Sequence, residues 1–392
     1  MNFLFISPNY PPIYYNFCTR LKAHGFTVIA LGDTEITNLR DDLRAVLTEY
    51  VRVNLSDYDA VKSAVAGLID RHGKIDGLES NNEYWLSTDA KLRRDFSIAG
   101  LLPDVLETYQ YKSKMKVPFV EAGVATAPFL VTIDHDVALG FARKYGFPIF
   151  AKPDKGVGAE ASAKLKTEEE LTAFFAGPLP TDYIFEVYVE GELYSYDGLT
   201  DREGNLVFEA SHLFTSPIDR LKETGEECVY LTLASVPPAL SHAGRRTIKA
   251  FGLKGRFFHI EFFKLKKPIG DFGIGEFAGL EVNMRPAGGC TPEMLNFAHG
   301  IDIYDLWARC MCEATVPPAT LDHTHMCVNV GRHSSRTYKL SPSDIAERYK
   351  DSLVFMGLTD THENPFGNFE VIARFKTEAE CNEFCTAVKE KA

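Results

Sequence analysis

The first hundred residues alternate between short apolar runs and longer amphipathic segments. Apolar runs typical of buried strands lie at residues 2–7, 27–31, 50–54 and 75–79, and helical segments lie between them at 14–24 and 58–71. Strands that alternate with helices in this way form parallel βαβ units. The N-terminal part is therefore predicted to be a small open α/β domain. Its first strand is not followed by a GxGxxG phosphate turn, so dinucleotide binding is not expected there.

Beyond residue 100 the pattern becomes less regular. Residues 101–107 (LLPDVLE) are interpreted as a linker, followed by helices at 112–122 and 136–145. Strands are expected at 148–152 and 182–189, with a loop of small residues at 153–162 between them. From residue 205 onward the pattern indicates mostly strands, with one helix at about 238–251 and a final strand and helix at 371–375 and 377–389. At about 150 residues per domain, a chain of 392 residues is expected to form two to three domains.

The charge and composition exclude several classes of protein. The chain has 42 basic and 54 acidic residues and a net charge of −12, which disfavours a nucleic-acid partner. It contains no run of about 18 apolar residues, so no membrane span is expected, and its N-terminus lacks the basic region and apolar stretch of a signal peptide. The eight cysteines form no repeated CxxC pairs, which favours free, mostly buried thiols in a cytoplasmic protein.

The segment 279–289 (GLEVNMRPAGG) carries the strongest chemical signal in the sequence. Side chains alternate between the two faces of a strand, so Glu281, Asn283 and Arg285 share one face. A carboxylate, an amide oxygen and a guanidinium in a row are unsuited to an apolar core. Oxygen donors suit Mg²⁺ and arginine suits a multi-oxygen anion, which predicts a metal and phosphate site. The alternative is a strand face exposed to solvent.

A second strand, at residues 257–265, adds to this signal. The run FFHIEFF is apolar except for His259 and Glu261, which share a face. A carboxylate in such a setting needs a partner, and a metal shared with Glu281 would supply one. The connection at 266–276 is long enough for a hairpin that places the two strands side by side. For His259, the favoured interpretation is a core-facing side chain with one hydrogen bond.

Two lysines and a loop of small residues are candidates for holding an anion. Lys152 ends an apolar strand and precedes the loop DKGVGAEAS, in which small residues would let backbone N–H groups approach phosphates. Lys112 opens a lysine-rich helix. Taken singly, such a loop is an ordinary turn and such a helix start is an ordinary solvated face.

Residues 184–192 (IFEVYVEGE) run from an apolar strand into a turn rich in carboxylates. A segment of this kind could present backbone groups to adenine and a carboxylate to ribose hydroxyls. The alternative is a hairpin with an acidic tip.

The order of these signals resembles the ATP-grasp superfamily over nearly the whole chain. Its elements here are Lys112-x2-Met115 followed by AGV, a strand ending at Lys152 before a glycine-bearing loop, ExYVEGE, HIEFF and EVNMRPAGG. The similarity is greatest to the branch with a biotin carboxylase-like layout, which contains the bacterial L-amino acid ligases.

The resemblance implies an α/β (α+β) fold in three parts. These are a Rossmann-like N-terminal pre-ATP-grasp domain at residues 1–105, a small lid and central subdomain with the phosphate loop at 106–190, and a C-terminal metal-binding subdomain with a terminal strand and helix at 191–392. It also implies an ADP-forming carboxylate–amine ligase that uses ATP and two Mg²⁺ ions, with Mn²⁺ as an alternative metal.

The resemblance further assigns a role to each matching residue. Lys112 and Lys152 would hold the nucleotide phosphates, and the loop after Lys152 would close over them. The implied loop residues are Gly156, Gly158 and Ser162. The implied adenine-binding hinge is Glu186, Val187, Tyr188 and Val189. The implied metal ligands are Glu261, Glu281 and Asn283, with Arg285 and Lys152 as catalytic residues at the transferred phosphoryl group.

One position departs from the family pattern. The family places a ribose-binding carboxylate two residues after the hinge glycine, where this chain has Leu193. A bulge at Gly191 would let a flanking carboxylate replace it, and Glu192 is the hypothesis, with Glu190 as the next candidate. Lys114 and Lys116 also compete with Lys112, which is favoured for its spacing to Met115.

The expected substrates are a small carboxylate and an amine, with amino acids as the first choice, and a homodimer is one option for the assembly. The irregular segment 216–230, which includes Arg220, is interpreted as a substrate loop or an ordinary surface excursion. Two other classes stay open: a phosphotransferase that uses the same site on a hydroxyl, and a nucleotide-binding protein without turnover. The full metal set argues against the second.

Overall fold

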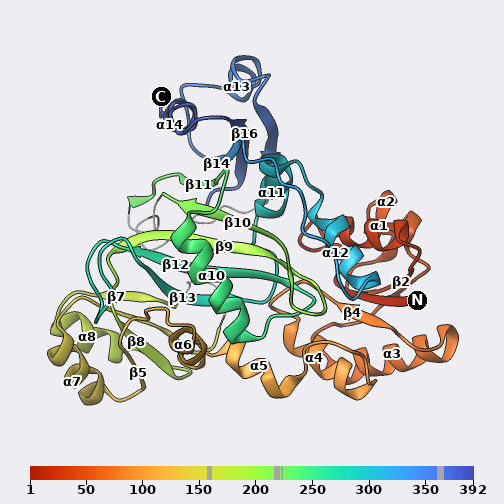
Figure 1. Ribbon diagram of the computed structural model, residues 1–392, viewed down its shortest axis with the longest axis horizontal. Helices are drawn as coiled ribbons and strands as arrows, with labels where there is room; N and C mark the ends of the chain where they lie inside the picture. Colours follow the sequence, from red (N-terminus) through yellow and green to blue (C-terminus); the bar gives the residue numbers. More distant parts are fainter. Residues whose placement is uncertain (157–160, 216–220, 222–223, 360–365) are drawn as a thin grey trace.

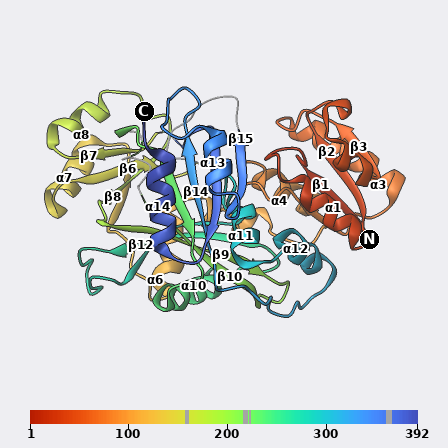
Figure 2. The same cartoon turned by 90° about the horizontal axis from the view of Figure 1, so that it is seen from above.

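The structure is a computed structural model that describes residues 1–156, 161–215, 221, 224–359 and 366–392. Its strands form three sheets, with four, four and eight strands. The N-terminal sheet and the small sheet with β5 to β8 lie at opposite ends of the molecule, and the eight-stranded sheet lies between them (Figure 1). Seen from above, the C-terminal strands and helices lie between the same two ends (Figure 2).

The N-terminal sheet is parallel, as predicted, with the strand order β3-β2-β1-β4. Its strands are β1 Asn2–Ile6, β2 Thr27–Gly32, β3 Glu49–Arg52 and β4 Gly77–Glu79. Its helices are α1 Tyr15–Ala23, α2 Asp41–Val46, α3 Tyr58–His72 and α4 Leu86–Asp95, with a 3₁₀ turn at Ile36–Asn38. Both faces of β1 are buried, because Phe3 and Phe5 pack toward α1 while Leu4 and Ile6 pack toward α3, as expected for a parallel sheet covered on both sides.

The predicted linker at 101–107 is wrong, because these residues enter helix α5, Pro103–Gln110. Proline is favoured at the first position of a helix, where no backbone donor is needed. Leu106 and Tyr109 bury one face of α5 in the same apolar cluster as Phe119 of the next helix, α6, Lys112–Glu121. The helix therefore continues the packed structure across the expected domain boundary at 105/106.

The second sheet is antiparallel, with the order β5-β8-β6-β7. Its strands are β5 Phe129–Thr132, β6 Ile149–Pro153, β7 Ala163–Leu165 and β8 Tyr183–Val187. Helices α7 His135–Tyr145 and α8 Glu168–Phe175 pack on it. The next strand, β9, belongs to the eight-stranded sheet, so residues 188–190 connect two sheets and the alternative of a simple hairpin is excluded.

The eight-stranded sheet has the order β13-β12-β9-β10-β11-β14-β16-β15. Its strands are β9 Gly191–Thr200, β10 Leu206–Phe214, β11 Cys228–Thr232, β12 Phe257–Leu265, β13 Phe277–Asn283, β14 Met326–Arg332, β15 Leu353–Leu358 and β16 Phe369–Phe375. The predicted helix at 238–251 is α10 Pro238–Phe251, and the final helix is α14 Glu378–Lys389.

The expectation of one helix between residue 205 and the final helix is wrong. Among the described residues, three more helices occur there: α11 Thr291–His299, α12 Ile303–Cys312 and α13 Pro342–Arg348. Each begins with a recognisable signal, since α11 and α13 have proline in the first turn and Asp302 caps α12. Trp307 of α12 is fully buried against Phe3 and Phe5 of the N-terminal sheet, so α12 joins the two parts of the molecule.

All eight cysteines lie in the described residues and are free, and six of them are buried, as predicted. In the parts of the chain that the structure describes, none of the helices combines the length and the apolar character needed to span a membrane.

Candidate active site

A cavity of about 510 Å³ lies where the small sheet, α6 and the edge of the eight-stranded sheet meet. It collects most of the residues that the sequence singled out. The predicted residues that line it are Lys112, Lys152, Gly156, Ser162, Glu186, Val187, Tyr188, Val189, Glu261, Glu281, Asn283 and Arg285. Gly158 lies outside the described residues, and Glu192 does not line the cavity.

The two acidic strands are neighbours, as the hairpin argument predicted. Strands β12 and β13 pair in antiparallel register, with Glu261 opposite Glu281 and His259 opposite Asn283. The register shifts directly after Glu261, which marks a β-bulge. The Asn283 amide donates to the Glu281 carboxylate at 3.3 Å. Burial acts to raise the pKa of Glu281, but Lys112 and Lys152 outweigh burial and hold the pKa below its usual value.

This donor set fits a hard cation. Glu261, Glu281 and Asn283 supply two carboxylates and one amide oxygen on paired strands, and Mg²⁺ typically takes one or two carboxylates together with waters and substrate phosphates. Among the described residues, no cluster of three or more His, Cys, Asp or Glu side chains could hold a metal alone. The site therefore fits an ion that a phosphate ligand helps to bind.

Helix α6 brings its lysines to this strand pair because it packs directly on β13. A Cβ atom added to Gly279 would lie 2.3 Å from the Phe119 ring, so only glycine allows this approach. Lys112 and Lys116 are four residues apart and share a helix face, and both line the cavity. Lys114, the other competitor, points outward and pairs with Glu107.

Glu186 holds two lysines from different elements. Its carboxylate pairs with the Nζ atoms of Lys116 and Lys152, each at 2.6 Å, and all three side chains are buried. Burial acts to raise the pKa of Glu186, but the two lysines lower it to about 2. Burial lowers the pKa of Lys116, whereas Glu186 and Glu281 outweigh burial and raise the pKa of Lys152. In this structure the Glu186 side chain therefore orients lysines.

The start of the loop after β6 is held near the first lysine. The Nζ atom of Lys112 donates to the Gly156 carbonyl at 3.0 Å, and Gly156 has a φ of +153°, which favours glycine. Asp154 accepts hydrogen bonds from the backbone and hydroxyl of Ser113, which fixes the start of α6 on the end of β6. The lysine and the loop are thus positioned by one contact between α6 and β6.

Arg285 lies in the cavity wall and contacts the N-terminal part of the chain. Its Nε atom donates to Glu83 at 3.0 Å, and its Nη1 atom donates to the Pro286 carbonyl at 2.8 Å. Burial raises the pKa of Glu83, although Arg285 opposes the shift. Glu83, in the turn between β4 and α4, was not identified from the sequence, because no local pattern indicates a contact that spans 202 residues.

His259 makes more contacts than the single hydrogen bond expected from the sequence. Its Nδ1 atom lies 2.6 Å from Asp197 of β9, and its Nε2 atom lies 3.4 Å from Glu261. Asp197 also binds Nδ1 of His212 at 2.8 Å and the hydroxyl of Ser195. Burial alone would lower the pKa of His259, but Asp197 and Glu261 raise it to about 10. The imidazolium therefore bridges a buried carboxylate and a candidate metal ligand.

The hinge places Leu193 at the cavity, with Glu192 on the other side of its strand. Gly191 and Leu193 line the cavity, and the Leu193 side chain is 9% exposed. Glu192 points to the opposite face, as neighbouring residues in a strand do, and pairs with Lys266 at 3.3 Å with 43% of its side chain exposed. Glu190 pairs with Lys267 at 2.6 Å. Strand β9 begins at Gly191 in regular register with β12, so the bulge suggested for this glycine is not present.

Solved structures of other proteins share this arrangement of sheets. The chain superposes on an L-amino acid ligase from Bacillus licheniformis with a TM-score of 0.73 and 16% identity, covering 98% of this chain and 95% of the ligase. The chain also superposes on an N5-carboxyaminoimidazole synthetase from Staphylococcus aureus with a TM-score of 0.71 and 12% identity. This match covers 99% of this chain and 97% of the synthetase. The chain has the ATP-grasp fold. The predicted fold class is thereby confirmed.

A third structure and two sequence relatives agree with this result. The biotin carboxylase domain of the Hydrogenobacter thermophilus 2-oxoglutarate carboxylase, solved with MgADP, gives a TM-score of 0.70 at 16% identity, over all of this chain and 90% of that domain. The large chain of carbamoyl phosphate synthase from Thermoanaerobacter sp. (strain X514) is 23% identical over 250 residues, which is 61% of this chain. This ATP-grasp chain spans 23% of the length of that relative, and 17% of a second one from Thermoanaerobacter pseudethanolicus. No protein-family model matches the chain.

Proposed function

We propose that this chain is an ATP-dependent carboxylate–amine ligase that releases ADP and phosphate. The observation that carries the proposal is the charge pattern of the 510 Å³ cavity. Its lysine and arginine side chains are Lys112, Lys116, Lys152, Lys155 and Arg285, and its carboxylates are Glu186, Glu261 and Glu281. An excess of lysine and arginine beside a carboxylate pair suits a polyphosphate together with a divalent cation.

The nucleotide would lie between the small sheet and strands β12 and β13. Lys112 and Lys152 would contact its phosphates, with Lys116 holding Glu186 in place behind them. The backbone from Val187 to Val189 would face adenine, and Gly156 and Ser162 would lie beside the phosphates. The solved MgADP complex of the biotin carboxylase domain supports a nucleotide with Mg²⁺ in this fold.

Glu261, Glu281 and Asn283 would hold the magnesium, for which we propose two ions. When bound, the metal would neutralise phosphate charge and polarise the terminal phosphoryl group. The chain's own part is to hold these oxygen atoms in place, and the His259–Asp197 pair fixes one side of Glu261.

In the proposed reaction a substrate carboxylate oxygen attacks the γ-phosphorus of ATP, and ADP leaves. The resulting acyl phosphate then reacts with an amine, which forms the amide and releases phosphate. Lys152 and Arg285 would stabilise charge on the transferred phosphoryl group. A water-free pocket prevents hydrolysis of the acyl phosphate. The reacting groups need only be positioned, so no nucleophilic side chain is required.

The proposed substrates are amino acids, because one structural neighbour is named as an L-amino acid ligase.

The proposed division into residues 1–105, 106–190 and 191–392 is supported by the sheets, since each of the three sheets falls within one part. We also propose a homodimer, which is supported by the Hydrogenobacter thermophilus biotin carboxylase domain, whose crystal structure is that of a dimer.

The proposal is tested by incubating the protein with Mg²⁺, ATP and pairs of amino acids while ADP and phosphate are measured. A ligase releases both only when carboxylate and amine are present together, and mass spectrometry then detects an amide. Addition of hydroxylamine in place of the amine should yield a hydroxamate from the acyl phosphate. A phosphorylated hydroxyl product without any hydroxamate would instead identify a phosphotransferase.

A further inference from the structure

The lysine and arginine side chains that line the nucleotide cavity differ in whether a carboxylate already pairs with them. Three of the five described ones have such a partner: Lys116 and Lys152 pair with Glu186, and Arg285 pairs with Glu83. Lys112 donates to a backbone carbonyl, and neither Lys112 nor Lys155 forms an ion pair among the residues that the structure describes. The Nζ atoms of Lys112 and Lys155 are therefore available to a phosphate.

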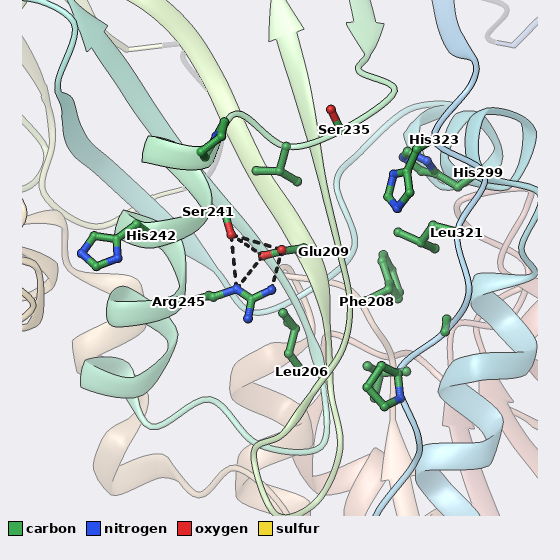
Figure 3. Close-up of a pocket in the computed structure, with 15 residues that line it drawn as sticks. Leu206, Phe208, Glu209, Ser235, Ser241, His242, Arg245, His299, Leu321 and His323 are labelled. Atoms are coloured by element: carbon green, nitrogen blue, oxygen red, sulfur yellow. Dashed lines mark hydrogen bonds and ion pairs between the residues drawn. The ribbon is translucent and has the colours of Figure 1, made fainter.

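A second cavity, of about 590 Å³, lies beside β10 and offers no such group. Arg245 is the one lysine or arginine among its described lining residues. The guanidinium of Arg245 donates to Glu209 at 2.7 Å, and the Ser241 hydroxyl donates to the same carboxylate at 3.0 Å (Figure 3). A charge that is paired within the chain attracts an added phosphate less than an unpaired one. Of the two cavities, only the nucleotide cavity therefore places an unpaired lysine in its wall.

The backbone of Lys155 is paired with that of Tyr111, the residue that precedes helix α6. Tyr111 and Lys155 form an isolated antiparallel bridge, and next to it the Lys112 N–H donates to the Asp154 carbonyl at 2.8 Å. Because this hydrogen bond joins the residues that flank the bridge, Tyr111 and Lys155 are a non-hydrogen-bonded pair, whose side chains lie close together on one side. The Nζ atom of Lys155 accordingly lies 5.2 Å from the centre of the Tyr111 ring.

This contact restricts a side chain that would otherwise be free. Lys155 is exposed and also lines the nucleotide cavity. A lysine Nζ atom within about 6 Å of the centre of a tyrosine ring is attracted by the face of the ring. Each rotamer that the Tyr111 ring disfavours lowers the conformational entropy that Lys155 loses when a phosphate binds to it.

The residues on both sides of Lys155 are held by the same short segment. Asp154 accepts hydrogen bonds from the backbone and the hydroxyl of Ser113, each at 2.7 Å, and the Lys112 Nζ atom donates to the Gly156 carbonyl at 3.0 Å. Residues 111–113 thus bind residues 154–156 at three successive positions. This arrangement fixes the backbone of Lys155 beside Lys112.

Lys114 provides an internal comparison, because it contacts the same ring. Its Nζ atom lies 4.9 Å from the centre of the Tyr111 ring. Unlike Lys155, Lys114 pairs with the exposed Glu107 and does not line the cavity. The ring of Tyr111 therefore contacts one lysine that faces the nucleotide cavity and one that points away from it.

We propose that Lys155 is a third lysine that binds the nucleotide phosphates, and that Tyr111 is the residue that positions it. The inference deepens the proposed function and rests on it, because ATP has to occupy this cavity. Lys155 donates to a phosphate oxygen beside Lys112, and the Tyr111 ring keeps the Lys155 side chain near that position before the nucleotide binds. Tyr111 itself contacts no phosphate.

The role of Lys155 is tested on the full chain with ATP and with adenosine, which carries no phosphate. Calorimetry measures ATP, and saturation-transfer NMR measures adenosine. Lys155→Met is expected to weaken ATP binding about fivefold or more and to leave adenosine binding unchanged, because only ATP offers the lysine an anion. Lys114→Met, the matched control, should leave both affinities unchanged. Far-UV circular dichroism checks that each variant folds.

A double-mutant cycle tests the role of Tyr111. Tyr111→Leu removes the ring and should weaken ATP binding about threefold, as expected for an exposed cation–π contact. Tyr111→Phe keeps the ring and should bind ATP like wild type. In a chain that already carries Lys155→Met, Tyr111→Leu should have no further effect, because the side chain that it positions is gone.

Two results would overturn the proposal. One is that Lys155→Met binds ATP as tightly as wild type, which would make Lys155 a surface lysine. The other is that Tyr111→Leu weakens ATP binding equally with and without Lys155→Met, which would show that Tyr111 acts through another residue. A loss of affinity in Lys112→Met without one in Lys155→Met would contradict this inference alone, whereas a wild-type chain that binds no ATP would contradict the proposed function as well.

Discussion

Glu261 and Glu281 lie directly opposite each other on the paired strands β12 and β13. Two carboxylates at this spacing repel one another unless cations lie nearby. Lys112 and Lys152 lower the pKa of Glu281, and the His259 imidazolium lies against Glu261. The lysines therefore favour the charged form of the Glu281 carboxylate, which is the state that a divalent cation requires of its ligands.

Replacement of Glu281 by Gln is expected to remove most of the proposed ligase activity while the chain still folds. The amide keeps the size of the side chain but deletes the charge that faces the metal, so turnover should fall by orders of magnitude and the Mg²⁺ requirement should rise. Measurements are ADP release against Mg²⁺ concentration and far-UV circular dichroism. Glu313→Gln, an exposed change, is the control. Near-normal turnover of Glu281→Gln at low Mg²⁺ would show that the residue is not a metal ligand.

The lysines of α6 offer a matched comparison on a single helix. Lys112→Met is expected to weaken ATP binding about tenfold or more, because Lys112 faces the cavity, whereas Lys114→Met should have little effect because Lys114 points outward to Glu107. Lys152→Met should weaken ATP binding and also slow phosphoryl transfer. Calorimetric titration with ATP measures the affinities. Equal losses for Lys112→Met and Lys114→Met would contradict the assignment.

The sequence suggested that Glu192 contacts ribose, and the position of Glu192 in the structure changes the result that we expect from its replacement. If Glu192 reads the 2′-hydroxyl, Glu192→Ala weakens ATP by about 1–3 kcal/mol and weakens 2′-deoxy-ATP much less. Since Glu192 lies outside the cavity and pairs with Lys266, we expect instead a change of less than twofold for both nucleotides. A selective loss for ATP would mean that β9 shifts when the nucleotide binds.

The buried Glu186 predicts a pH dependence of stability. Its folded-state pKa of about 2 lies below the ordinary glutamate value near 4.5, so the stabilisation is fully present above pH 4.5 and is lost as the pH falls toward 2. The shift corresponds to roughly 3 kcal/mol at neutral pH. Glu186→Gln should therefore be less stable than wild type at pH 7. The difference between their free energies of unfolding, called the stability gap, should narrow below about pH 4.5.

Urea unfolding of wild type and Glu186→Gln at pH 7, 5, 4 and 3.5 measures this stability gap. Glu168→Gln serves as the control, because Glu168 forms only an exposed pair with Arg143. A gap between wild type and Glu186→Gln that stayed constant over this range would show that the two lysines do not stabilise the Glu186 carboxylate.

Local patterns in the sequence were sufficient for the elements that carry the chemistry. The alternation of Glu281, Asn283 and Arg285 and of His259 and Glu261 identified β12 and β13, because a half-buried strand imposes a period of two on its own residues. The alternating runs before residue 80 likewise predicted the parallel N-terminal sheet. The helices missed after residue 205 are short, with 9, 10 and 7 residues, so each offers few turns in which an amphipathic pattern can be recognised.

The tertiary structure decided which side chains meet. Glu186 pairs with Lys116 and Lys152, Arg285 with Glu83, and Asp197 with His259, and each pair joins elements that are far apart along the chain. Such contacts arise from packing, here from α6 resting on Gly279 and from the register of β9 with β12, and no local periodicity encodes them. The same holds for Leu193. The sequence shows that this position is a leucine, but only the packing of β9 decides that the Leu193 side chain faces the cavity.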